Sequence, residues 1–161
     1  MMLLASEVRT MTHSELKRLI SLQGHCSYNE SNKAEFRRLG TKLARELRKQ
    51  LGMSHAHAEV HFNAGGIAVS GDVTLRVTDG RIGGFYLSFN ADGISSGLGI
   101  MYRHCSPDNL YGASTSTPNH WYVWSLLEEQ GIQSFVDVLQ WFMGYRCIAN
   151  NMRCTGHEAI K

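Results

Sequence analysis

The sequence has only four cysteines and no long apolar run, and each of these features excludes a class of protein. Its four cysteines, Cys26, Cys105, Cys147 and Cys154, are too scattered for a dense disulfide framework. No apolar stretch approaches the roughly 18 residues that span a bilayer, so we expect no membrane partner. The opening MMLLASEV lacks the basic segment of a signal peptide. We therefore expect reduced thiols and a cytoplasmic protein.

The charge is unevenly distributed along a chain whose composition is that of a globular protein. Hydrophobic residues make up 43% of the 161 residues and charged residues 19%, which favours one ordered domain. Residues 9–52 hold ten of the sixteen Lys and Arg residues but four of the fourteen acidic ones, a formal charge of +6 in a chain of +2. One end is therefore basic and the remainder mildly acidic, which matters for the choice of partner.

The hydrophobic pattern divides the chain into four parts. Residues 12–52 have helical periodicity, residues 58–105 alternate as strands do, residues 106–120 form a long polar loop with both prolines, and residues 121–143 are helical again. Met11 is an alternative to Met1 as the true start, because the pattern becomes organised only from Thr12. We expect an α+β fold: two N-terminal helices, an antiparallel sheet of four or five strands, and C-terminal helices packed on one face.

Local signals mark where the helices begin. Thr12 and Glu15 have the spacing of a capping box for a short first helix. Ser31 or Asn32 can cap a second helix that runs through Leu51. Two helical pieces are expected near the end, around residues 121–130 and 132–142.

The second helix has an apolar side and a basic side. Its apolar residues recur at steps of three or four: Phe36, Leu39, Leu43, Leu47 and Leu51. At about 100° per residue the opposite side carries six basic residues, which are the main candidate binding residues: Arg37, Arg38, Lys42, Arg45, Arg48 and Lys49. Glu35 and Glu46 lie on one flank, so pairing at i,i+4 is sparse. Such a ridge can follow a phosphate backbone or meet an acidic protein surface, and it can also be only a solvated face.

The stretch HAHAEVHF contains a possible metal site. On a strand, His57, Glu59 and His61 point to the same face, and two imidazoles with a carboxylate can hold zinc or iron. No distant fourth ligand is evident. We prefer the simpler interpretation, a polar strand face whose other side, with Val60 and Phe62, is buried, and we expect no metal or cofactor.

Cys105 is a possible nucleophile at the start of the long loop. Arg103 or a protonated histidine could favour its thiolate, and His120 could act as a base if it folds back. His104 is adjacent on the strand and faces the opposite way. We favour a buried cysteine that closes the strand, while Arg103 and Tyr111 remain further candidate binding residues beside the loop.

Two segments, NAGGIAVSGDVTL and IMYRHCSPDNLYG, resemble parts of small uncharacterised accessory proteins of bacterial plasmids and prophages. In those proteins a helical N-terminus similar to ARELRKQLG precedes the glycine-rich segment. The resemblance covers roughly residues 40–112, and ASTSTPNH departs from it. It implies an accessory gene of a mobile element, a class that includes inhibitors of restriction or CRISPR nucleases and small nucleic-acid-binding regulators.

From these observations we expect a non-enzymatic binding protein. The most concrete form is an inhibitor of a host defence nuclease, of anti-CRISPR or anti-restriction type, which contacts that protein through the basic helix. The first alternative is a small DNA- or RNA-binding protein. The second is a cysteine- or metal-dependent hydrolase.

Overall fold

The computed structural model describes residues 10–53, 58–63, 72–77, 85–90, 99–104, 119–143, 145–147 and 157–159. The fold is α+β, which confirms the predicted class. None of the described helices is both long enough and apolar enough to cross a membrane. The elements are α1 (His13–Ser21), α2 (Glu30–Gln50), β1 (Ala58–Asn63), β2 (Asp72–Val77), β3 (Phe85–Asn90), β4 (Gly99–His104), β5 (His120–Val123), α3 (Trp124–Gln130), α4 (Ile132–Met143), β6 (Tyr145–Cys147) and β7 (His157–Ala159).

The first helix begins with the predicted capping box, whereas the predicted cap of the second helix is wrong. The Thr12 hydroxyl accepts the Glu15 N–H at 3.1 Å, and the Glu15 carboxylate accepts the Thr12 N–H at 2.9 Å. Helix α2 is capped by Asn29 rather than by Ser31 or Asn32. The Asn29 side-chain oxygen accepts the Asn32 N–H at 3.0 Å, so the helix begins one residue before Ser31.

Strands β1 to β5 form an antiparallel sheet in sequence order, and β6 pairs with β7 separately. Strand β5 corrects the expectation that residues 121–123 begin the helical part. Tyr122 lies opposite Ile100 in the register of β4 and β5, and α3 starts only at Trp124. The segment HWYV is aromatic and β-branched, which suits a half-buried strand.

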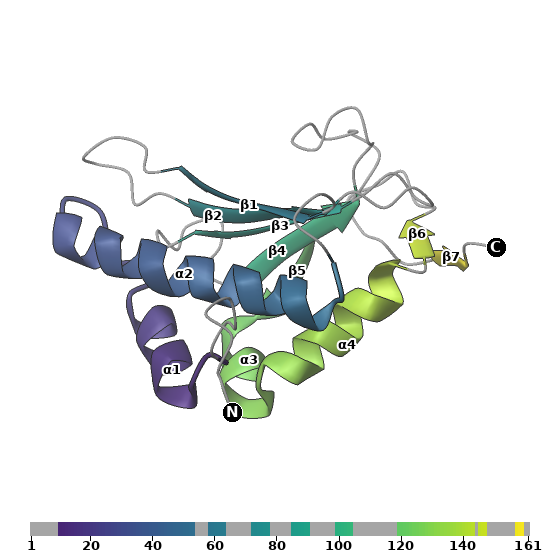
Figure 1. The fold of residues 1–161 in the computed structure, drawn as a ribbon, viewed down its shortest axis with the longest axis horizontal. Helices are drawn as coiled ribbons and strands as arrows, with labels where there is room; N and C mark the ends of the chain where they lie inside the picture. Colours follow the sequence, from purple (N-terminus) through teal and green to yellow (C-terminus); the bar gives the residue numbers. More distant parts are fainter. Residues whose placement is uncertain are drawn as a thin grey trace, which may run out of the picture.

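The helices lie together on one side of the five-stranded sheet (Figure 1). Helix α2 packs on β1 and β2, α1 packs on α2, and α3 contacts β4 and β5. The side chains of Val73, Leu75 and Val77 on β2 have no exposed surface, and neither do Leu39 and Leu43 on α2. Burial of each such side chain stabilises the fold by roughly 1.5–3 kcal/mol. The apolar stripe of α2 therefore fixes which side of this helix is turned away from any partner.

The two acids expected on one flank of α2 have partners near the N-terminus. Glu46 is buried, with 4% of its surface exposed, and accepts the Met11 N–H at 2.6 Å. The second Glu46 oxygen accepts a hydrogen bond from Gln50 at 3.2 Å. Glu35 forms an ion pair with Arg18 of α1. These acids therefore fasten α1 and the residue before its cap to α2.

Candidate binding groove between helix α2 and strand β1

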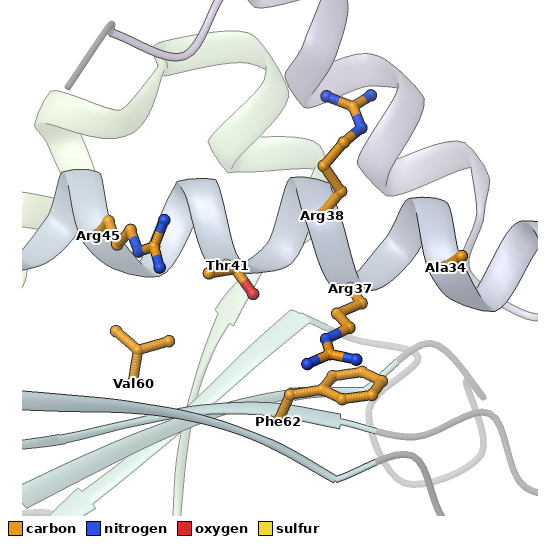
Figure 2. A pocket seen from close by; sticks show the side chains of 7 residues that line it. All are labelled: Ala34, Arg37, Arg38, Thr41, Arg45, Val60 and Phe62. Atoms are coloured by element: carbon orange, nitrogen blue, oxygen red, sulfur yellow. The ribbon is translucent and has the colours of Figure 1, made fainter. Parts of the chain in front are cut away.

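The basic residues of α2 do not form one surface, because the helix has neighbours on both flanks. They spread over an arc of about 140° from Arg37 to Lys42. Arg37, Arg45 and Arg48 lie on the flank that faces β1. Arg38 extends toward α1 on the opposite flank (Figure 2). Packing therefore divides the ridge into two groups with different surroundings.

Lys42 belongs to the α1 flank and is held in an ion pair. Its ammonium donates to both carboxylate oxygens of Glu15, at 2.9 and 2.8 Å, and Arg38 lies 4.0 Å from one of them. The hydrogen bond from Lys42, followed by the one from the Thr12 backbone, lowers the pKa of Glu15 from 4.5 to about 2. The charge of Lys42 is therefore matched within the fold, and we leave this residue out of the candidate groove.

The β1 flank of α2 borders a hollow of about 460 Å³. Its floor includes the half-buried side chains of Val60 and Phe62, which were expected to be buried on the inner face of the strand. The Arg37 guanidinium carbon lies 4.7 Å from the centre of the Phe62 ring, a cation–π contact that is visible in Figure 2. The other lining residues are Ala34, Arg38, Thr41 and Arg45.

A second hollow, of about 370 Å³, continues the first along β1. The two share Arg45 and Val60, so we treat them as one feature, the α2–β1 groove. Arg48 donates from Nη1 to the Ala58 carbonyl at 3.3 Å. Burial, and secondarily the neighbouring charge of Arg45, lowers the pKa of Arg48. The second hollow is also lined by Glu59 and His61, so it reaches around the edge of the strand.

The electrostatics of the groove are unbalanced. Among the residues that the structure describes, no carboxylate forms an ion pair with Arg37 or Arg45. Glu59 is the acid in the lining, and its hydrogen bond goes to His61 at 3.0 Å. Two guanidinium groups thus border an apolar floor without a matching charge, which is an arrangement suited to an anionic ligand with some apolar surface.

The remaining candidate residues lie elsewhere. Lys49 is exposed on α2 outside the lining. Arg103 is on β4, where it lies opposite Tyr86 of β3, and Tyr86 in turn lies opposite Arg76 of β2. Its neighbours Tyr102 and His104 are buried on the helix side, so Arg103 points to the other face of the sheet. Tyr111 lies outside the described residues.

The residues of the metal and nucleophile hypotheses lie only partly within the described structure. Glu59 and His61 share a strand face and hydrogen-bond each other, while His57 lies outside the described residues. In the part of the chain that is described, no three His, Cys, Asp or Glu side chains gather as a metal site. Cys105 also lies outside that part. His120 stacks on Tyr102 with ring centres 5.2 Å apart and meets the edge of Phe142, so its surroundings are those of an aromatic cluster.

No family model matches the chain, and comparisons with curated proteins and with solved structures give no match either. The groove is therefore interpreted from its own residues. Sequence reasoning did not identify Val60, Phe62 and Thr41 as lining residues of the groove. Nothing in the sequence pattern marks these three residues as part of a binding site. The groove exists because β1 ends the sheet beside α2, and a pattern of alternating residues does not reveal which strand is at the end.

Proposed function

We propose that this protein is a non-enzymatic binding protein whose α2–β1 groove binds an acidic surface of a partner protein. The observation that carries the proposal is the pair Arg37 and Arg45, which border the apolar side chains of Val60 and Phe62 with no carboxylate paired to them among the described residues. Both arginines are exposed, and exposed arginines next to apolar and aromatic side chains are typical of surfaces that become the energetic centres of protein interfaces.

A protein partner is favoured over nucleic acid by the same residues. Binders of single strands stack bases on aromatic rings, but Arg37 lies over the Phe62 ring in the groove. Lys42, which could otherwise contact a phosphate, is paired with Glu15. Direct DNA or RNA binding remains the second candidate because residues 9–52 carry a formal charge of +6.

The most concrete form of the proposal is an inhibitor of a host defence nuclease. The resemblance of residues 40–112 to accessory proteins of mobile elements supports this context, as does a basic surface that could occupy acidic regions of such an effector. A CRISPR or restriction nuclease would be met in the cytoplasm, so a cytoplasmic location is part of the proposal. The groove requires no metal, cofactor or nucleophile.

The test compares two variants with equal changes in charge. In the first, Arg37→Glu and Arg45→Glu reverse the charge of the groove. In the second, Lys17→Glu and Lys49→Glu reverse two exposed charges outside it. Tagged proteins are used to capture partners from bacterial lysate treated with nuclease, and bound proteins are identified by mass spectrometry.

We expect a specific protein to be retained by the wild type and by the second variant and lost from the first. Retention by all three would contradict a role for the groove. Loss of every partner after nuclease treatment, with nucleic acid recovered from untreated lysate, would favour the second candidate. Cys105→Ser and His57→Ala are expected to leave retention unchanged, whereas the hydrolase alternative requires one of them to abolish the activity.

A further inference from the structure

Strand β1 is the end of the five-stranded sheet, and the α2–β1 groove runs along it. In the described structure β2 is the neighbour of β1, with antiparallel pairs over Ala58–Asn63. In an edge strand every second residue turns its N–H and C=O away from the neighbouring strand, so these groups can pair with another chain. The edge of β1 therefore offers main-chain hydrogen bonds in addition to the charges of α2.

We propose that the partner supplies an extended acidic segment, which pairs with β1 as a sixth strand below α2. This inference rests on the proposed function and specifies the form of the ligand. It is carried first by the shape of the groove. Val60 lines the groove from the inner face of β1, and Glu59 and His61 line it from the outer face. A hollow lined by successive residues of one strand lies at the edge of that strand, because the side chains of successive residues point to opposite faces.

The arginines of α2 lie at the level of this edge. Arg48 donates to the Ala58 carbonyl at 3.3 Å, so a guanidinium from the helix already contacts the backbone of β1. Arg37 contacts Phe62 near the other end of the strand. Figure 2 shows Arg45 on the Val60 side and Arg37 over Phe62, with the helix following the strand. Carboxylates on an added strand would thus find cations along its length.

The same charges explain how the edge avoids pairing indiscriminately. Natural edge strands are protected by proline, by bulges or by inward-pointing charges, because an open edge invites aggregation. The sequence AEVHFN of β1 contains no proline or lysine. The arginines of α2 can protect the edge of β1 instead. A neutral strand added to β1 would bury their positive charges without a carboxylate to pair with them, which is unfavourable. The arginines therefore disfavour the addition of a neutral strand and favour the addition of an acidic one.

The spacing of the arginines defines the pattern of the added strand. Arg37 and Arg45 are eight residues apart, which corresponds to roughly 12 Å along a helix. Two side chains on the same face of a strand are roughly 13 Å apart when they are four positions apart in the sequence. The matching segment therefore carries acids at positions i and i+4, with a small apolar residue at i+2 toward Val60. Its opposite face is neutral, because Glu59 lies there.

A synthetic peptide with this pattern, GTETVTETG, tests the inference by fluorescence anisotropy and NMR titration of the full chain. Its scrambled control, GTEETVTTG, has the same composition but places the two acids on opposite faces. Two further peptides keep all charges and differ in backbone N-methylation, one on both glutamates and the valine, the other on the two inner threonines. Each form blocks the hydrogen-bond donors along one edge of the peptide.

We expect one methylated form to lose at least about tenfold in affinity and the other to bind within about twofold of the parent, because one edge of the added strand faces β1. The scrambled peptide should bind at least about tenfold more weakly than the parent. When the peptide binds, amide exchange in β1 should slow at alternate residues. These are either Ala58, Val60 and Phe62 or Glu59, His61 and Asn63.

Equal binding by both methylated forms, or by the scrambled peptide, would overturn strand addition. If the parent peptide then still loses affinity with Arg37→Glu and Arg45→Glu, acidic recognition by the groove stands and only its strand form fails. If no peptide binds and the double variant also retains every captured partner, the proposed function fails with it. Lys17→Glu with Lys49→Glu controls for the change in net charge.

Discussion

The ammonium of Lys42 lies 2.9 and 2.8 Å from the two carboxylate oxygens of Glu15, and this contact joins α1 to α2. Glu15 also completes the capping box of α1. One carboxylate therefore both begins a helix and neutralises a cation on the helix next to it. The contact also explains why a ridge of six basic residues leaves a smaller set for a partner.

Substitution of Glu15 tests the strength of this contact. Glu15→Gln keeps a side chain that can cap the Thr12 N–H but removes the ion pair with Lys42. We expect a loss of about 1 kcal/mol in the free energy of unfolding at pH 7, since the pair is partly exposed. Urea denaturation measures it, with Glu129→Gln on the surface of α3 as the control. Equal losses in the two variants would show that the ion pair has no stabilising effect.

The same pair gives a pH dependence with a defined sign. The pKa of Glu15 is lowered from 4.5 to about 2 in the folded chain, so the unfolded state binds a proton more readily. The stabilisation is complete above about pH 4.5 and declines as the pH falls toward 2. The difference in unfolding free energy between wild type and Glu15→Gln should follow this course. A difference that stays constant from pH 6 to pH 2 contradicts the assignment.

Glu46 is the buried acceptor for the Met11 N–H, at 2.6 Å. Glu46→Ala should destabilise the fold by about 1–3 kcal/mol, because the buried donor is left without its acceptor. Glu46→Gln retains an oxygen at that position and should cost less. Thermal or urea unfolding of both variants provides the measurement. If Gln costs as much as Ala, the hydrogen bond to Met11 is not the source of the stabilisation.

The contact between Arg37 and Phe62 needs an aromatic ring. We expect Phe62→Leu to lower the free energy of unfolding by about 1 kcal/mol, because it keeps an apolar floor but loses the cation–π contact. Phe62→Tyr keeps the ring and should unfold close to the wild-type denaturant concentration. If Phe62→Leu and Phe62→Tyr change the free energy of unfolding by the same amount, the cation–π contact does not stabilise the fold.

Gly99 permits the close approach of β4 and β5. Its φ is 156°, and a Cβ atom there would lie 1.8 Å from the Tyr122 carbonyl oxygen. Gly99→Ala must separate the two backbones, so we expect a loss of about 3 kcal/mol or more. Gly52 also has a positive φ, 72°, but its Cβ position is open among the described residues, so Gly52→Ala should cost only about 1 kcal/mol. Similar denaturation midpoints for Gly99→Ala and Gly52→Ala would contradict this prediction.

Local signals explain what could be predicted. The capping box at Thr12 and the apolar stripe of α2 depend on residues within one or two turns, and both are present as expected. The cap at Asn29 was misplaced because several polar residues there offer similar side chains. Strand β5 was missed because HWYV precedes a helical pattern without a break, and only its pairing with β4 decides its conformation.

By itself the sequence determined the α+β class, the apolar side of α2 and the concentration of positive charge in residues 9–52, because periodicity and composition act along a single segment. Only the tertiary structure decided which of those charges are matched. Lys42 meets Glu15 from a different helix, and Arg37 and Arg45 meet the apolar side chains of an edge strand. The partner of each flank depends on how α1 and β1 pack against α2, and no spacing within α2 records that arrangement.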